Sequence, residues 1–133
     1  MKHLFFVIIT LTVFSLHSKA QVSFSCYYRE ICEWNNEEKT FDNCKGYEES
    51  SLFVMNKSET MFTHTTEDNK STYYVDKKTY DEKNNVWIYT VTSDVGNKYL
   101  FVFDPKNKEI RALVLDSDMN QVLMIRFYVK MIF

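Results

Sequence analysis

The stretch VWIYTVTSDVGNKYLFVFD, residues 86–104, decides the fold. Its two apolar runs, Val86–Ser93 and Lys98–Asp104, are rich in β-branched and aromatic side chains, which suit a pleated and half-buried surface. Between them lies Gly96, a residue type that adopts positive φ without steric cost. Because neither run is long enough for a typical helix, the stretch predicts a β-hairpin.

The same alternation of apolar run and polar turn continues on both sides of this hairpin. Runs follow at 109–116 and 121–133, and earlier runs lie at 22–32, 52–55, 60–66 and 71–81. Together they predict an all-β protein, an antiparallel meander of about eight strands. Because consecutive strands usually pair, such a meander forms a small barrel or a sandwich.

Side chains of a strand point alternately to its two faces, so each run can be sorted by face. In 121–133, every second residue from Leu123 is apolar, as expected for a core strand. In 71–81 the alternation puts Tyr73 and Val75 on one face and Tyr74 and Tyr80 on the other. The apolar alternation at the C-terminus is also typical of an outer-membrane barrel, but the charges in 71–81 favour the soluble alternative.

Residues 1–20 have the pattern of a secretory signal peptide. A basic start at Lys2 precedes a mostly apolar stretch at 4–16, and Ala20 provides the small residue that signal peptidase requires. We expect cleavage after Ala20, a secreted or periplasmic protein, and a single β domain at 21–133. Within it, 21–50 contains the cysteines and 51–133 the meander. The alternative is an envelope-associated structural protein lipidated at Cys26.

The charge of the expected mature chain excludes one class of partner. Removing residues 1–20 leaves 14 basic and 18 acidic residues, a formal charge of −4. Binding to nucleic acid requires clustered Lys and Arg, and no such cluster is present. The apolar stretch at 4–16 is too short to span a bilayer comfortably, which favours a cleaved signal peptide over a membrane anchor. We expect no transmembrane segment in the mature chain.

Three cysteines remain after the expected cleavage, and an exported protein meets oxidising conditions. If 22–32 is extended, Cys26 and Cys32 lie about 20 Å apart, too far for a disulfide. Cys44 is therefore expected to pair with one of them, and we favour Cys32–Cys44. Cys26 is then a buried thiol or pairs with another chain. The acidic segment 30–59 around these cysteines is interpreted as a solvated, loop-rich face.

Catalytic and cofactor chemistry has few candidate residues. His64 is the only histidine in 21–133, so a hydrolase would have to use it, with Cys26 or Glu59 nearby. We expect instead a strand histidine that is hydrogen-bonded to threonines. The turn at 116–120 begins like a calcium loop, but Gln121 stands where that loop needs glycine. Without a glycine-rich phosphate loop or a metal-ligand cluster, the sequence predicts neither cofactor nor metal.

Aromatic residues make up 17% of the chain, and several gather in the strands predicted between residues 71 and 104. They either fill the core or line a cleft with hydroxyl groups at its rim. The candidate ligand-binding residues are Tyr73, Trp87, Tyr89, Tyr99 and Phe101. We expect a non-enzymatic binding module for a small apolar or amphipathic molecule, or for a protein partner on the aromatic sheet face.

The even meander over 52–133 resembles a small lipocalin-like, or calycin, barrel. The chain as a whole resembles small uncharacterised β-sheet proteins that bacteria export. The Gly-x-Trp motif of lipocalins is absent, because Trp34 lies between Glu33 and Asn35. The resemblance therefore implies the general architecture and no particular ligand.

Overall fold

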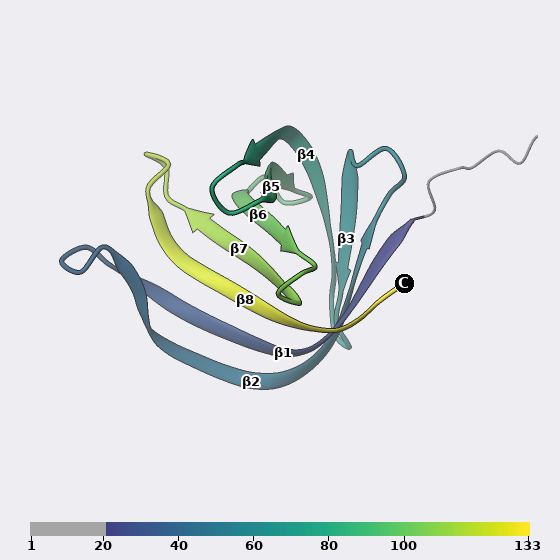
Figure 1. The fold of residues 1–133 in the computed structure, drawn as a ribbon, viewed down its shortest axis with the longest axis horizontal. Coiled ribbons are helices and arrows are strands. Elements are labelled where there is room, and N and C mark those ends of the chain that lie inside the picture. The colour runs from purple at the N-terminus through teal and green to yellow at the C-terminus, as the bar shows by residue number, and fades with distance from the viewer. Residues whose placement is uncertain (1–20) are drawn as a thin grey trace, which may run out of the picture.

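The computed structural model describes residues 21–133, and the expected signal peptide at 1–20 lies outside them. The described chain forms a closed antiparallel barrel in which each strand pairs with the next and the last pairs with the first (Figure 1). This confirms the predicted meander and shows a barrel, not a sandwich. The strands are β1 (Val22–Asn35), β2 (Thr40–Met55), β3 (Met61–Thr65), β4 (Lys70–Asp81), β5 (Val86–Ser93), β6 (Lys98–Asp104), β7 (Glu109–Leu115) and β8 (Gln121–Ile132).

The barrel closes where β1 meets β8. Their pairing runs from Phe24 opposite Ile132 to Glu33 opposite Leu123. Beyond it, Ser23 and Phe133 exchange two backbone hydrogen bonds, of 2.7 and 2.9 Å. Closure satisfies the strand edges that an open sheet of this length would expose. Nowhere in 21–133 does the chain form a helix long and apolar enough to cross a membrane.

Aromatic rings fill the interior of the barrel. Phe53 and Phe62 are fully buried, and Phe101 is nearly so. The ring centroids of Phe62 and Phe101 lie 4.9 Å apart, and those of Phe53 and Phe127 are at the same distance, both edge to face. Such contacts contribute about 0.5–1.5 kcal/mol each beyond burial of area. Because the rings block the middle of the barrel, only its two ends can be hollow.

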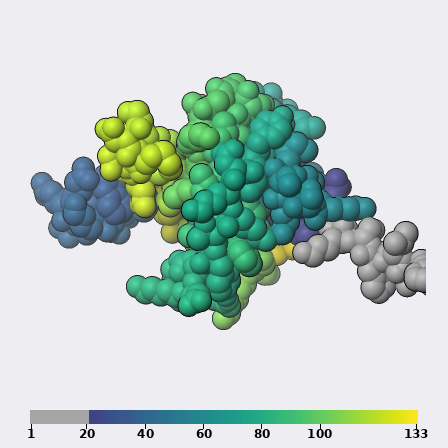
Figure 2. All heavy atoms as spheres, turned by 90° about the horizontal axis from the view of Figure 1, so that it is seen from above, coloured from purple at the N-terminus to yellow at the C-terminus, as the bar shows by residue number. Residues whose placement is uncertain are grey.

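The interpretation of 30–59 as loop-rich is wrong. β1 continues to Asn35 and β2 begins at Thr40, so most of this acidic segment is one long hairpin. The end of this hairpin that carries the turn at 36–39 lies beyond the closed barrel, because β2 pairs with β3 only over Leu52–Met55. In Figure 1 this hairpin extends away from the rest of the barrel, and Figure 2 shows its blue tip beside the yellow β7–β8 turn.

Two β-bulges change which side chains face inward. In β1 the register shifts between Cys26 and Tyr28, and as a result Arg29 is paired with the buried Phe127. In β4 the register shifts between Val75 and Lys77. The second bulge moves Tyr80 to the face of Tyr73 and Val75, so its assignment to the face of Tyr74 is wrong. A bulge inserts one residue and reverses the alternation beyond it.

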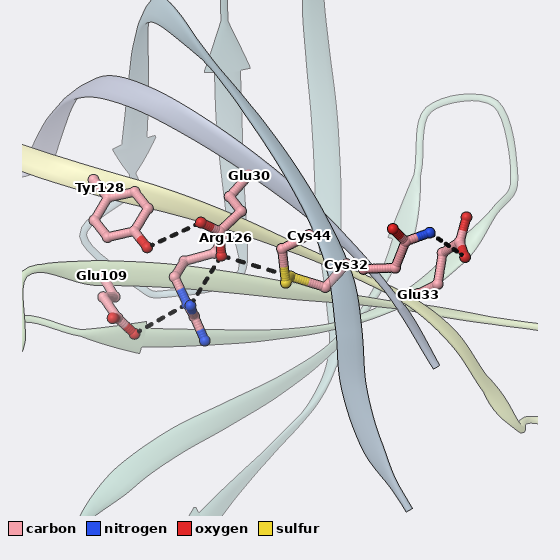
Figure 3. Close-up of a disulfide and its surroundings, with 8 residues drawn as sticks. Glu30, Cys32, Glu33, Cys44, Glu109, Arg126 and Tyr128 are labelled. Atoms are coloured by element: carbon pink, nitrogen blue, oxygen red, sulfur yellow. Dashed lines mark hydrogen bonds and ion pairs between the residues drawn. A yellow bond between two sulfur atoms is a disulfide. The ribbon is translucent and has the colours of Figure 1, made fainter. Parts of the chain in front are cut away.

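The disulfide joins Cys32 and Cys44, as predicted, and Cys26 is a buried free thiol. Figure 3 shows the bond beside an ionic cluster on the outside of the barrel. There Glu30 accepts hydrogen bonds from Arg126 at 3.1 Å and from the Tyr128 hydroxyl at 3.4 Å. The bond joins β1 to β2 within the long hairpin, and the cluster ties the hairpin to β8.

Candidate functional site

The antiparallel meander places alternate turns at opposite ends of the barrel, and each end is hollowed. One end carries the turns at 56–60, 82–85 and 105–108, together with Gln21 and Phe133. The other end carries the turns at 36–39, 66–69, 94–97 and 116–120. We call the first hollow the apolar cup and the second the polar cup, after the side chains that line them.

The apolar cup has a volume of about 350 Å³. Its walls come from β1, β2, β5 and β6, and five of the lining side chains, Phe24, Met55, Val86, Tyr89 and Phe103, are buried. At its rim Trp87 remains 44% exposed. The lining residues are Val22, Phe24, Met55, Asn56, Lys57, Glu59, Asn85, Val86, Trp87, Tyr89, Phe103 and Pro105.

A small polar network fixes one wall of the apolar cup. The Tyr89 hydroxyl donates to Glu59 Oε1 at 3.1 Å, and Lys78 Nζ lies 2.7 Å from Glu59 Oε2. The Lys78 ammonium also sits 4.2 Å from the centroid of the Trp87 ring, a cation–π contact. Burial and the Glu59 charge both raise the pKa of Tyr89, so its hydroxyl stays protonated and remains a donor. The network holds Trp87 and Tyr89 as a rigid aromatic wall.

The turn that carries Glu59 is also well defined. The Asn56 side-chain oxygen accepts hydrogen bonds from the backbone N–H groups of Thr60 at 2.9 Å and Met61 at 3.2 Å. Glu59 itself has a φ of 55°, in the left-handed region. An asparagine side chain that bonds its own turn favours such a conformation. This turn therefore positions the Glu59 carboxylate at the cup.

The polar cup has a volume of about 450 Å³ and lies inside the opposite end. Rings form part of its wall and charged or hydroxyl-bearing side chains form the rest. The residues that line it are Arg29, Tyr47, Glu49, His64, Thr66, Asp68, Asn69, Ser71, Tyr73, Tyr99, Phe101, Ala112, Ile125 and Phe127.

His64 lies in the wall of the polar cup and is only 8% exposed. Its ring stacks on Phe53 at 4.1 Å with the planes 8° apart. Burial, reinforced by the Arg29 charge, lowers the pKa of His64 to about 4, so the imidazole is neutral at neutral pH. The expected hydrogen bonds to threonines are wrong, because its partner in packing is a phenyl ring and Nε2 has no hydrogen-bond partner among the described residues.

Arg29 reaches the polar cup because of the bulge in β1. Its guanidinium lies 4.9 Å from the centroid of Phe127 and pairs with Glu49 at 2.6 Å. The Nε atom of Arg29 is buried and, like His64 Nε2, has no hydrogen-bond partner in the part of the chain that the structure describes. Arg29 and His64 both line the polar cup.

The five predicted ligand-binding residues divide between the two cups. Tyr73, Tyr99 and Phe101 line the polar cup, whereas Trp87 and Tyr89 line the apolar cup. Four of them belong to one continuous stack, since Phe101 contacts Tyr73, Tyr99 and Phe103, and Phe103 contacts Tyr89.

The sequence did not identify Arg29, Glu59 or Phe24 as site residues. The alternation of β1 alone places Arg29 outside, and only the bulge reverses it. Phe24 gives an ordinary core signal in a strand. For Glu59 the sequence suggests only a role beside His64.

The catalytic arrangements considered from the sequence do not form around His64. Glu59 lines the apolar cup, at the end opposite His64. Cys26 is 3% exposed, and burial raises the pKa of its thiol to about 11, which keeps it protonated and unreactive.

Two features bear on metal binding. Glu30, Cys32 and Cys44 have ligand atoms close together, but the two sulfurs are bonded to each other and offer no thiolate. In the calcium-like turn, Asp116 accepts hydrogen bonds from the backbone N–H groups of Asp118 and Asn120 at 2.9 and 2.8 Å. This carboxylate closes a hairpin turn, as predicted.

The fold and the two cups define the class as a small closed all-β barrel with hollowed ends. Comparisons of the chain with family models, with curated proteins and with solved structures found no match.

Proposed function

We propose that this is a secreted or periplasmic, non-enzymatic binding protein that holds a small apolar molecule in the apolar cup. The observation that carries the proposal is a hollow of about 350 Å³ walled by buried apolar side chains, with a half-exposed tryptophan at its mouth. Small-molecule sites are typically of this size and character, and the mouths of β-barrels are a preferred place for them.

The wall of the cup is organised before any ligand arrives. Phe24 and Phe103 contact each other at 5.3 Å, and Tyr89 packs edge to face on Phe103 at 5.6 Å. Lys78 contacts the Trp87 ring and pairs with Glu59, which accepts a hydrogen bond from Tyr89. A preorganised wall loses little conformational freedom on binding, which increases affinity for an apolar ligand.

The disulfide supports the proposed export. Disulfides persist mainly in oxidising compartments, and the Cys32–Cys44 bond closes the hairpin of β1 and β2. Cys26 favours the unlipidated form. It is buried within β1 opposite Ser51 and Val129, so processing to a lipidated Cys26 would remove paired residues from the start of β1.

The test is a titration with N-phenyl-1-naphthylamine, a neutral apolar fluorescent probe. We expect saturable one-to-one binding with a Kd of about 10 μM, which corresponds to roughly 0.4 kcal/mol per non-hydrogen atom. Trp87→Ala should weaken binding about tenfold, because losing about 1.4 kcal/mol of apolar contact is one decade. The matched control is Tyr74→Ala, which removes a 51% exposed ring that lines neither cup. An absence of saturation, or equal effects of the two substitutions, would refute the proposal.

A further inference from the structure

The polar cup contains polar atoms whose bonding capacity is not used within the described chain. Arg29 Nε and His64 Nε2 are both buried and have no hydrogen-bond partner there. A buried polar group without a partner is unfavourable by about 1–3 kcal/mol. Most such groups in proteins have a partner, so an exception calls for an explanation such as a water molecule or a ligand.

The two nitrogens restrict the chemistry of a partner. Arg29 Nε–H can only donate, so the partner atom must accept a hydrogen bond. The neutral His64 ring has one donating and one accepting nitrogen, so Nε2 can meet a donor or an acceptor. A hydroxyl group satisfies both residues, because its oxygen accepts from Arg29 while its proton or its second lone pair serves His64.

The charges around the cup disfavour an organic anion. The Arg29 guanidinium is already paired with Glu49 at 2.6 Å, and Asp68 adds a second carboxylate to the lining. An organic anion would meet two carboxylates for a single guanidinium. An ammonium group would be attracted to the two carboxylates, but it cannot accept the hydrogen bond that Arg29 Nε–H offers. A neutral hydroxyl group can accept that bond without the repulsion that an anion meets.

The walls of the cup are flat and aromatic. Tyr73 contacts Tyr99 at 5.7 Å and Phe101 at 5.0 Å, and Phe127 lies beneath the Arg29 guanidinium. Rings of this kind pack well against another ring, by stacking or edge to face. We propose that the polar cup is a second binding site, for a small neutral phenol whose hydroxyl group bonds Arg29 and His64 and whose ring packs on Tyr73, Tyr99 and Phe101.

This site is separate from the apolar cup. The two hollows share no lining residue, and the buried rings of Phe53 and Phe62 fill the interior of the barrel between its ends. The proposal therefore does not depend on the function proposed above. Each of the two can fail while the other holds.

The chain offers two specific reporters for a test. Ala112 lines the polar cup and is the only alanine from residue 21 onward, and His64 is the only histidine there. Methyl and imidazole NMR signals of these two residues therefore report on this cup alone. Trp87, with its indole N–H signal, reports on the apolar cup.

The experiment titrates the protein with four probes of similar size, p-cresol, toluene, benzoate and benzylamine. We expect p-cresol to shift the Ala112 and His64 signals saturably, with at least tenfold higher affinity than each of the other three, because a site that bonds a hydroxyl rejects an analogue without it. Equal affinity for toluene, preference for benzoate or benzylamine, or shifts confined to Trp87 would overturn the proposal.

Two variants identify the bonding groups. His64→Phe keeps a ring stacked on Phe53 and removes the nitrogen atoms, so the preference for p-cresol over toluene should fall to the part that Arg29 supplies. Arg29→Gln should lower the affinity for p-cresol at least fivefold. The control Tyr74→Ala should leave the affinity unchanged. If His64→Phe retains the full preference for p-cresol, the proposal is wrong; if either variant does not fold, the four-probe comparison on the unaltered protein still decides it.

Discussion

The buried histidine makes the stability of this protein depend on pH in a way that one substitution should remove. In the folded protein the pKa of His64 is about 4, whereas in an unfolded chain it is about 6.5. The unfolded chain therefore binds more protons between these two values. Stability contributed by the neutral imidazole is fully present above pH 6.5 and is lost as the pH falls toward 4.

The size of this effect follows from the two pKa values. By linkage, a difference of this size corresponds to about 3 kcal/mol of unfolding free energy between pH 7 and pH 4. Other groups also change stability over this range, because Asp104, Asp76 and Asp81 have lowered pKa values. A comparison with His64→Phe removes their contribution, since the carboxylates are the same in both proteins. The variant preserves an aromatic ring against Phe53.

The assay is urea unfolding of both proteins at pH 7 and pH 4, followed by far-UV circular dichroism. We expect the unaltered protein to lose about 3 kcal/mol more than His64→Phe on acidification. An NMR titration of the single imidazole in 21–133 should show no protonation of His64 above pH 5. Equal losses in the two proteins, or a measured His64 pKa near 6.5, would refute the reasoning that the ring is buried in the wall of the barrel.

Three further predictions concern the hairpin and the export of the chain. Replacing both Cys32 and Cys44 by Ser should lower the unfolding free energy by about 3 kcal/mol in the chain-entropy model, for a bond that spans 12 positions, and an unchanged urea midpoint would contradict this. Gly46→Ala should destabilise the protein by about 1–3 kcal/mol, because a Cβ there would clash with the Tyr28 ring and hydroxyl. In a Tyr28→Ala background the same change should cost much less, and strict additivity of the two changes would argue against the clash. Mass spectrometry of the exported protein should show a chain that begins at Gln21, whereas a diacylated chain beginning at Cys26 would show a lipoprotein.

Much of the fold could be predicted from the sequence, because its strands bury one face in the barrel. β5 and β7 lie in the closed part and show the alternation that one-sided burial imposes, and β6 is an apolar run that is buried on both faces from Phe101 to Asp104. The first part of β2 could not be predicted in this way. From Phe41 to Ser50 both of its faces are largely exposed, so no apolar alternation marks it as a strand. Pairing with β1 and the disulfide hold it, and both are tertiary effects.

The candidate site could be predicted only in part. The aromatic side chains were visible, but their separation into two cups depends on where each lies along the barrel axis. Tyr99 and Phe103 are on one face of β6, yet they belong to opposite cups, because they are near opposite ends of the strand. Arg29 was missed because the β1 bulge reverses its direction, and a bulge leaves no reliable signal in one sequence.

A crystal structure of the exported protein grown with N-phenyl-1-naphthylamine would show whether the barrel is closed and where it binds an apolar molecule. We expect β1 paired to β8, and density for the naphthyl ring between Met55, Phe103 and Trp87. Density for the probe anywhere other than the apolar cup, or a sheet that opens between β1 and β8, would contradict this expectation.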